Sequence, residues 1–215
     1  MAALTTLQLR IVALVQSVEP APLLFGGAAI LALYSDHRLT RDLDLQWQPC
    51  DDLSQVAPQV QRVLTAAGIT WAVIQRSPTF VRLRAALHDE VVLLDLVAHP
   101  GSARTDTCRA MIGGVPCLAL TLQGALMDKL GALLSRQEGR DLDDIAHLLA
   151  VGGDLAAALA AAPNQDAGFS CMTVAWLLRG WRMEAVALAS GWSPAKMAEM
   201  TLFRDQLVER LAASV

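Results

Sequence analysis

The sequence lacks the features of a secreted, disulfide-stapled or membrane-embedded protein. Its four cysteines show neither CxxC spacing nor adjacent histidines, so no zinc site or disulfide framework is indicated, and buried thiols are expected. No segment reaches the roughly 18 uncharged apolar residues that a membrane span requires. The N-terminal stretch has no basic region ahead of its apolar residues, which is unlike a signal peptide. We therefore expect a cytoplasmic protein with no membrane partner.

An excess of positive charge is also missing. The formal net charge is -4, which argues against a protein that coats nucleic acid with its whole surface, because such affinity comes from neutralised phosphates. Arg76, Arg82 and Arg84 lie on expected strands, and Arg82 and Arg84 share a face, so they form either a local groove for RNA or ordinary surface charge. With 54% hydrophobic residues, the chain of 215 residues can bury a sizeable core, as one domain or as two small ones.

The first half of the chain alternates between helix and strand patterns. Apolar spacing predicts helices, and short alternating or apolar runs predict strands. His88-Asp89 is the expected turn of a hairpin between the last two strands. The predicted helices are residues 4–17, 28–34 and 53–67, and the predicted strands are residues 23–25, 42–47, 71–75, 79–87 and 90–97.

The second half reads as helical. Small and polar residues from His99 to Ser102 mark a boundary, and we divide the chain into a core of residues 1–100 and a mainly helical domain of residues 101–215. Thr121 is the expected N-cap of a helix to about residue 137, and Gly139 precedes another to about residue 150. Ser193-Pro194 opens the last helix. The resulting fold class is α/β (α+β).

Asp42 and Asp44 are the first candidates for chemistry. They alternate with leucines in an expected strand, so both carboxylates point to one face. Carboxylate oxygens are ligands that Mg²⁺ takes together with substrate phosphates. A solvated acidic strand edge is the alternative, and this pattern alone does not decide between the two.

Asp95 interrupts a strand that otherwise looks buried on both faces. A buried carboxylate needs a cation, a hydrogen-bond network or a metal, because burying it alone costs several kcal/mol. A salt bridge to Arg82 or Arg84 is one solution. The two earlier aspartates in the same expected sheet favour a shared metal instead.

Gly26-Gly27 lies between an expected strand and an expected helix. Glycines let the backbone approach a ligand, and a helix N-terminus offers N–H groups to phosphate, although a glycine pair is more often only a turn. The pair precedes the two aspartates by a short segment, so a phosphate cradle and metal ligands could share one crevice.

A second charged group follows in the helical half. Lys129 and Arg136 are seven residues apart on one helix and share a face, where they could meet phosphate or could simply be solvated. Asp141 could be the N-cap of the next helix, with Asp144 at its third position. Neither interpretation is decided by the sequence. The isolated histidines His37, His88, His99 and His147 receive no role.

Taken in order, these elements resemble the AbiEii-type abortive-infection nucleotidyltransferase family of the polymerase-beta-like nucleotidyltransferase superfamily. The resemblance spans residues 24–149, and its longest motif is the last one. The matching positions are Gly26-Gly27, Asp42-Leu43-Asp44, Asp95, and Lys129-xx-Ala132-xxx-Arg136-xxx-Arg140-Asp141-xx-Asp144. One position departs from the family pattern, because Ala28 stands where Ser or Thr is usual and a hydroxyl is missing there.

The resemblance implies a nucleotidyltransferase fold, with a small mixed sheet, flanking helices and a helical C-terminal domain. It implies binding of an NTP with Mg²⁺ or Mn²⁺, transfer of NMP to a hydroxyl of tRNA or protein, and pairing with an antitoxin. Asp42, Asp44 and Asp95 would hold metal, and Asp95 could instead activate the acceptor hydroxyl. The other site positions implied are Gly26, Gly27, Lys129, Arg136 and Arg140 for the nucleotide and Asp144 as a further acid.

Two alternatives stay open at this point. One is transfer of the nucleotide to a small molecule, as in antibiotic-modifying nucleotidyltransferases, which needs an enclosed acceptor pocket. The other is a non-catalytic nucleotide-binding or interaction module. Ala28 and the hydrophobic C-terminal part motivate it, because Trp176, Trp181 and Trp192 could form a partner surface, although core packing is the commoner use of tryptophan.

Overall fold

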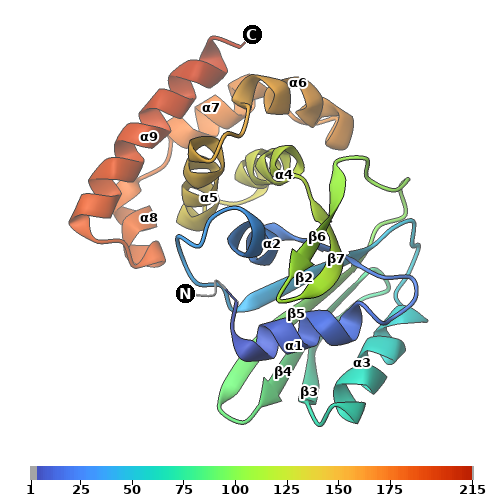
Figure 1. Ribbon diagram of the computed structural model, residues 1–215. Coiled ribbons are helices and arrows are strands. Elements are labelled where there is room, and N and C mark those ends of the chain that lie inside the picture. The colour runs from blue at the N-terminus through green and yellow to red at the C-terminus, as the bar shows by residue number, and fades with distance from the viewer. Residues whose placement is uncertain (1–3, 215) are drawn as a thin grey trace. The chain divides into compact units, whose positions relative to one another are not determined.

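The computed structural model describes residues 4–214, except for the side chain of Gln165, and the chain divides into two units after Thr121 (Figure 1). The first unit holds a sheet with three helices, and the second holds helices. None of the described helices is both long enough and apolar enough to cross a membrane.

Seven strands of the first unit form one mixed sheet. The pairs β2–β5 and β1–β7 are parallel, and the remaining neighbours are antiparallel. In sheet order the strands are β3 (Thr70–Arg76), β4 (Phe80–Leu87), β5 (Glu90–Ala98), β2 (Asp42–Trp47), β1 (Leu23–Phe25), β7 (Val115–Leu120) and β6 (Thr107–Ile112). This confirms the mixed sheet that the resemblance implied.

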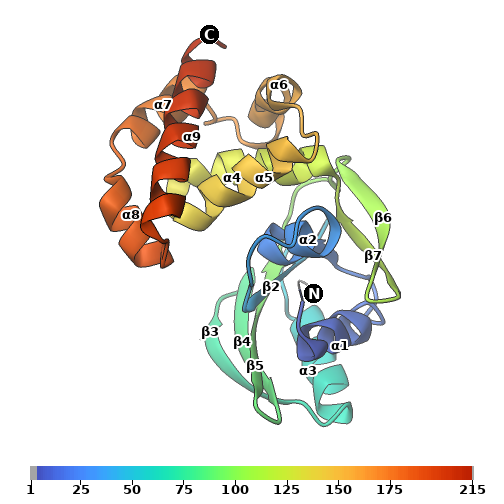
Figure 2. The same ribbon diagram turned by 60° about the vertical axis from the view of Figure 1, so that its left-hand side comes forward.

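Alternation along β4 and β5 decides which face of the sheet is buried. Val81 and Leu83 on β4 are buried in the same core as Leu94 on β5. That core also contains residues of α1 (Thr6–Val15) and α3 (Val56–Ala66), which pack together beside these strands (Figure 2). Because side chains alternate, Arg82 and Asp95 lie on the opposite face of the sheet.

The hairpin of β4 and β5 has the predicted turn. Leu87 pairs with Glu90, which leaves His88 and Asp89 as the two turn residues. His88 has a φ of 51°, the left-handed conformation that tight hairpin turns require. The turn therefore fixes the register of every pair further along the two strands.

The division between the units lies further along the chain than the sequence indicated. Residues 101–121 were assigned to the helical domain, with the division near residue 100. Instead β6 and β7 form a hairpin, and β7 adds to the sheet beside β1. The strand signal was weak because β6 is half-exposed and carries polar residues among its apolar ones. The parallel pairing with β1, far away in sequence, is what holds this hairpin in the sheet.

The second unit consists of helices that pack mainly as α4 with α5, α4 with α6, and α7 with α9. The side chain of Ser193 caps α9 and Pro194 occupies its first turn, as predicted. The helices are α4 (Leu122–Ser135), α5 (Gly139–Ala150), α6 (Leu155–Gln165), α7 (Cys171–Arg179), α8 (Met183–Ser190) and α9 (Pro194–Ala212). The sequence patterns predicted a mainly helical segment here but gave no bounds for α6, α7 and α8.

Two smaller expectations are met only in part. Of the four cysteines, Cys117 alone is buried, and the other three are half-buried. Trp181 packs in the core of the second unit, whereas Trp176 on α7 is 70% exposed. Trp192 is half-buried. The tryptophans therefore do not share one environment.

Candidate functional site

Asp42, Asp44 and Asp95 lie on two adjacent strands of the sheet. Asp42 and Asp44 are half-buried on one face of β2, while Leu43 and Leu45 are fully buried on the other, as the alternation predicted. Strand β5 runs parallel to β2, and Asp44 is in register with Asp95. Neighbouring strands lie about 4.8 Å apart, so these two side chains start from adjacent positions on the same face. We call the three residues the acidic cluster.

Asp95 forms a salt bridge with Arg82, one of the two arginines that the sequence offered for this role. Arg82 Nε donates to Asp95 Oδ1 at 2.7 Å, and Arg82 Nη2 donates to Oδ2 at 2.5 Å. This two-bond arrangement is the strongest geometry for an arginine and a carboxylate. The salt bridge neutralises Asp95, which is 7% exposed, and so offsets the cost of burying its carboxylate.

The charges of Asp42 and Asp44 also act on Arg82. The hydrogen bonds to Asp95 raise the pKa of the Arg82 guanidinium against the opposing effect of burial, and the charges of Asp95, Asp42 and Asp44 raise that pKa further. The guanidinium therefore lies within the field of all three carboxylates. It stays charged at any pH at which the protein is folded.

Gly26 closes the other side of Asp44. Phe25 at the end of β1 pairs with Asp44, and Gly26 follows with a φ of +66°, where side chains are strained. A Cβ at Gly26 would overlap the carboxylate of Asp44, so the absence of a side chain is a steric requirement of this contact. Gly26 therefore lies beside Asp44, as expected from the sequence.

Gly27 has a cationic neighbour that the sequence did not single out. A Cβ at Gly27 would lie 2.7 Å from Nη2 of Arg38, whose guanidinium rests against the glycine. Arg38 comes from the loop between α2 (Gly26–Leu33) and β2. Ala28, the next residue of α2, is fully buried in the core. Its methyl group therefore contributes to core packing.

The charged residues of the second unit form what we call the ion-pair cluster: Lys129, Arg136, Asp141 and Asp144. Lys129 Nζ lies 2.8 Å from a carboxylate oxygen of Asp141 and 2.8 Å from one of Asp144. Arg136 donates to both oxygens of Asp141, from Nε at 2.7 Å and from Nη2 at 2.9 Å. Lys129 is 4% exposed and both aspartates are fully buried, which rules out a solvated face for Lys129.

Asp141 is not the N-cap that the sequence suggested. Helix α5 begins at Gly139 with Glu138 as its N-cap residue, so Asp141 lies inside the first turn. Its carboxylate accepts from Lys129 and Arg136. Burial alone raises the pKa of the Asp141 carboxyl, but the hydrogen bonds and charges of these two cations outweigh it, and the net pKa is below the ordinary value.

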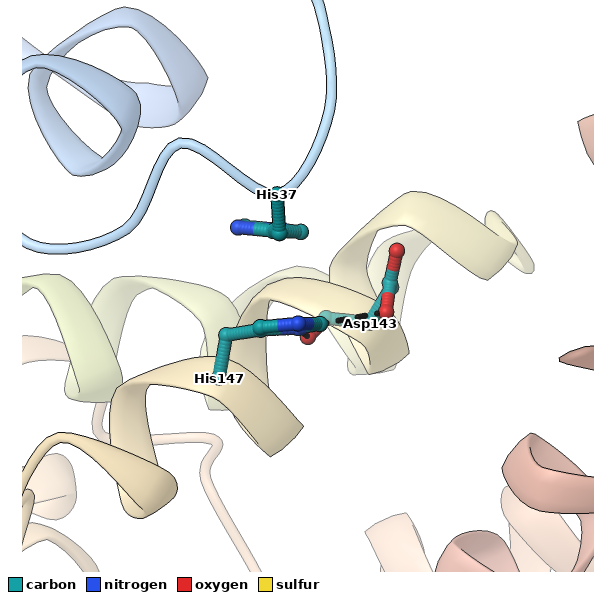
Figure 3. Close-up of side chains that lie close together, drawn as sticks. All are labelled: His37, Asp143 and His147. Carbon is teal, nitrogen blue, oxygen red and sulfur yellow. Dashed lines mark hydrogen bonds and ion pairs between the residues drawn. The ribbon is translucent and has the colours of Figure 1, made fainter. Parts of the chain in front are cut away.

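Two further groups of α5 carry charge. Arg140, an implied nucleotide contact, forms an ion pair with Glu138. On the same helix His147 Nδ1 lies 3.3 Å from Asp143 Oδ1, and Figure 3 shows this pair. Lys196 of α9 reaches the same carboxylate oxygen at 2.8 Å, so Asp143 ties α5 to α9.

Arg82 was recognisable from the sequence once the hairpin was assumed. With His88 and Asp89 as a two-residue turn, counting outward pairs residue 87 with 90 and residue 82 with 95. Arg84 then falls opposite Leu93, so only one of the two arginines faces Asp95. Arg38 carried no comparable signal, because its contact with Gly27 depends on the path of a loop.

A sheet with paired aspartates beside a glycine turn is the arrangement of a nucleotidyltransferase fold, and solved structures bear out the fold. MenT4, a nucleotidyltransferase toxin from Mycobacterium tuberculosis, aligns with a TM-score of 0.58 over 97% of this chain and 82% of its own, at 14% identity. JHP933 from Helicobacter pylori aligns with a TM-score of 0.54 over 98% of this chain and 94% of its own, at 16% identity.

A family model identifies the chain more specifically. The model described as nucleotidyl transferase AbiEii toxin, type IV toxin–antitoxin system, matches residues 10–209. The chain therefore belongs to the AbiEii family of nucleotidyltransferase toxins. No curated protein matches the sequence. The family match confirms the resemblance and extends beyond residue 149, into the C-terminal third that the motifs had left unmatched.

Proposed function

We propose that this protein transfers NMP from an NTP to a hydroxyl of tRNA or of a protein, in a reaction that depends on Mg²⁺ or Mn²⁺ held by the acidic cluster. The observation that carries the proposal is the register of Asp44 with Asp95 on parallel strands, next to a glycine at which any Cβ would overlap Asp44. Membership of the AbiEii family supports the reaction class. The metal, the acceptor and the roles of individual residues are the proposed part.

The residues fit a hard divalent cation. Asp42, Asp44 and Asp95 supply carboxylate oxygens from one face of two neighbouring strands, which is the donor type that Mg²⁺ takes. Each oxygen of Asp95 bonded by Arg82 keeps further lone-pair capacity, so the salt bridge does not exclude coordination. When bound, the metal supplies neutralisation of phosphate charge and alignment of the attacking and leaving oxygens.

The chain's own groups would position the nucleotide. The backbone N–H groups of Gly26 and Gly27 lie in the first turn of α2, at the positive end of the helix dipole. A triphosphate is favoured there. Arg38 lies against Gly27 and would add a cation at that point. The acceptor oxygen would then form a bond to the α-phosphorus while the bond to pyrophosphate breaks, and the hydroxyl proton would pass to Asp95 or to water.

Four residues of the helical unit have roles in the proposal: Lys129, Arg136, Arg140 and Asp144. By the family resemblance, the three cations would bind the nucleotide and Asp144 would act as a further acid. Because Lys129 is buried and paired with Asp141 and Asp144, a phosphate would have to displace one of these carboxylates in order to bind it. The same pairs support a second role for Lys129 in folding, which has to be measured separately.

As a toxin, the enzyme would be controlled by a cognate antitoxin, which the family description supports. Incubation of the purified protein with each α-labelled NTP, Mg²⁺ and a cell extract tests the proposal. We expect label on tRNA or on a protein band, and no label with Asp44→Asn. Asp89→Asn is the matched control, because Asp89 is an exposed aspartate in a turn of the same sheet.

The outcomes separate the alternatives. Transfer of label to RNA or to protein identifies the acceptor class, and transfer only to small molecules indicates an enzyme of the antibiotic-modifying type. Nucleotide binding without any transfer by the wild-type protein contradicts catalysis and supports a binding module. Equal transfer by the wild type and by Asp44→Asn contradicts the assignment of the acidic cluster.

A further inference from the structure

Arg82 binds Asp95, the buried carboxylate of the acidic cluster. It holds Asp95 through two hydrogen bonds, and Asp95 is in register with Asp44 on the neighbouring strand. The hairpin register places it directly opposite Asp95, on the strand next to β5. Its position is therefore set by backbone pairing and is independent of the paths of the loops.

The guanidinium is supported on one side and accessible on another. Its Cζ lies 5.7 Å from the centroid of the Phe80 ring, within the range of a cation–π contact. The side chain of Arg82 is 37% exposed, compared with 10% for that of Asp95. Arg82 thus covers a buried carboxylate while part of its own surface faces solvent.

We infer that Arg82 is a resident counter-cation that sets the metal affinity of the acidic cluster. This inference rests on the proposed function. In the metal-free protein, Arg82 neutralises part of the repulsion among carboxylates that lie on one face of adjacent strands. When a divalent cation binds there, the fixed positive charge of Arg82 repels it, so the site binds metal more weakly than the carboxylates alone would.

This role differs from that of a simple structural tie between two strands. A tie contributes the same stability whether or not metal is present. A counter-cation contributes most in the metal-free state, because a divalent cation takes over its neutralising effect. The difference between the two roles is therefore visible in how metal changes the stability of an Arg82 variant, without any measurement of catalysis.

The chain provides a matched control on the same strand. Arg84 lies two residues beyond Arg82 on the same face of β4, but it pairs with Leu93 and is exposed. Arg84→Gln removes the same charge as Arg82→Gln and shortens the side chain equally, on the same face of β4. It leaves the contacts of Asp95 intact.

The test measures Mn²⁺ binding by electron paramagnetic resonance and thermal unfolding with EDTA or with Mg²⁺. For Arg82→Gln we expect a lower unfolding temperature in EDTA, a larger rise on adding Mg²⁺ than the wild type shows, and about tenfold tighter Mn²⁺ binding. Arg84→Gln should match the wild type in each measurement. Arg82→Lys keeps the charge without the two-bond geometry, and its Mn²⁺ affinity should stay within about twofold of the wild type.

Several results would overturn the inference. An unfolding temperature lowered equally with and without Mg²⁺, together with unchanged Mn²⁺ affinity, makes Arg82 a structural tie only. If Arg82→Gln does not fold, tenfold tighter Mn²⁺ binding by Arg82→Lys contradicts the role of charge. Failure of the proposed function looks different, because then the wild type and Asp44→Asn show the same weak Mn²⁺ binding.

Discussion

The acidic cluster of the sheet and the ion-pair cluster of the helical unit both combine aspartates with cations, and they differ in burial. In the ion-pair cluster of the helical unit, both aspartates are fully buried and Lys129 binds both of them. In the acidic cluster of the sheet, Asp42 and Asp44 are half-buried, and Arg82 on Asp95 is partly exposed. Similar side chains are thus used in two environments.

The difference shows how to separate a structural charge cluster from a candidate site. Buried charges have to be neutralised by partners within the fold, and losing one partner leaves a costly charge behind. In the acidic cluster, the half-buried Asp42 and Asp44 can accept a cation from solvent, while Arg82 neutralises the buried Asp95. We therefore expect mutations in the ion-pair cluster to act mainly on folding, and mutations in the acidic cluster to act mainly on metal binding.

The largest expected effect on stability is that of Lys129→Met. The change removes the ammonium that lies 2.8 Å from both Asp141 and Asp144, and we expect the free energy of unfolding to fall by about 4 kcal/mol. Lys196→Met is the comparison, because Lys196 is more exposed and should cost about 1 kcal/mol. Urea denaturation measures both. A loss below about 1 kcal/mol for Lys129→Met would break the distinction between the two clusters.

Asp141→Asn sharpens the comparison through pH. Folding lowers the pKa of Asp141 below its ordinary 3.8, so its contribution to stability is fully present above about pH 4 and is lost as the pH falls through the lowered pKa. We expect the variant to be less stable by about 3 kcal/mol at pH 7, with the gap to the wild type shrinking in acid. Urea denaturation across pH 2–7 measures the gap, and a gap independent of pH would refute this account of Asp141.

Gly26→Ala has a smaller effect on stability but reaches the acidic cluster directly. An alanine at position 26 is strained by the positive φ, and its Cβ overlaps the carboxylate of Asp44. We expect the free energy of unfolding to fall by about 2 kcal/mol. Gly68→Ala is matched in backbone strain, since Gly68 has a φ of +72° and a Cβ there meets nothing within 4 Å. It should lose about 1 kcal/mol. If nucleotide transfer falls equally in both variants, the contact with Asp44 is irrelevant to function.

The sequence was informative where short-range patterns decide the structure. The alternation of Asp42 and Asp44 with leucines correctly gave their common face, and the two-residue turn at His88-Asp89 was correctly located. Both features depend on residues close together in the chain. The paired register of Asp44 with Asp95 depends on β2 and β5 being neighbours, which local patterns do not specify.

The remaining differences have the same origin in long-range packing. Asp141 looked like an N-cap because Asp144 stands three residues after it, but α5 starts earlier and buries the carboxylate of Asp141 against Lys129 and Arg136. The hairpin of β6 and β7 was missed because its place in the sheet depends on pairing with β1. The contact of Arg38 with Gly27 depends on a loop path.

The central claim is that Asp42, Asp44 and Asp95 hold a divalent cation. A titration of the wild type, Asp44→Asn and Asp89→Asn with Mn²⁺, followed by electron paramagnetic resonance, tests it without reference to substrate or acceptor. The account predicts that the wild type and Asp89→Asn bind with equal affinity and that Asp44→Asn binds at least about tenfold more weakly, since one carboxylate ligand is lost. Equal Mn²⁺ binding by all three proteins would contradict it.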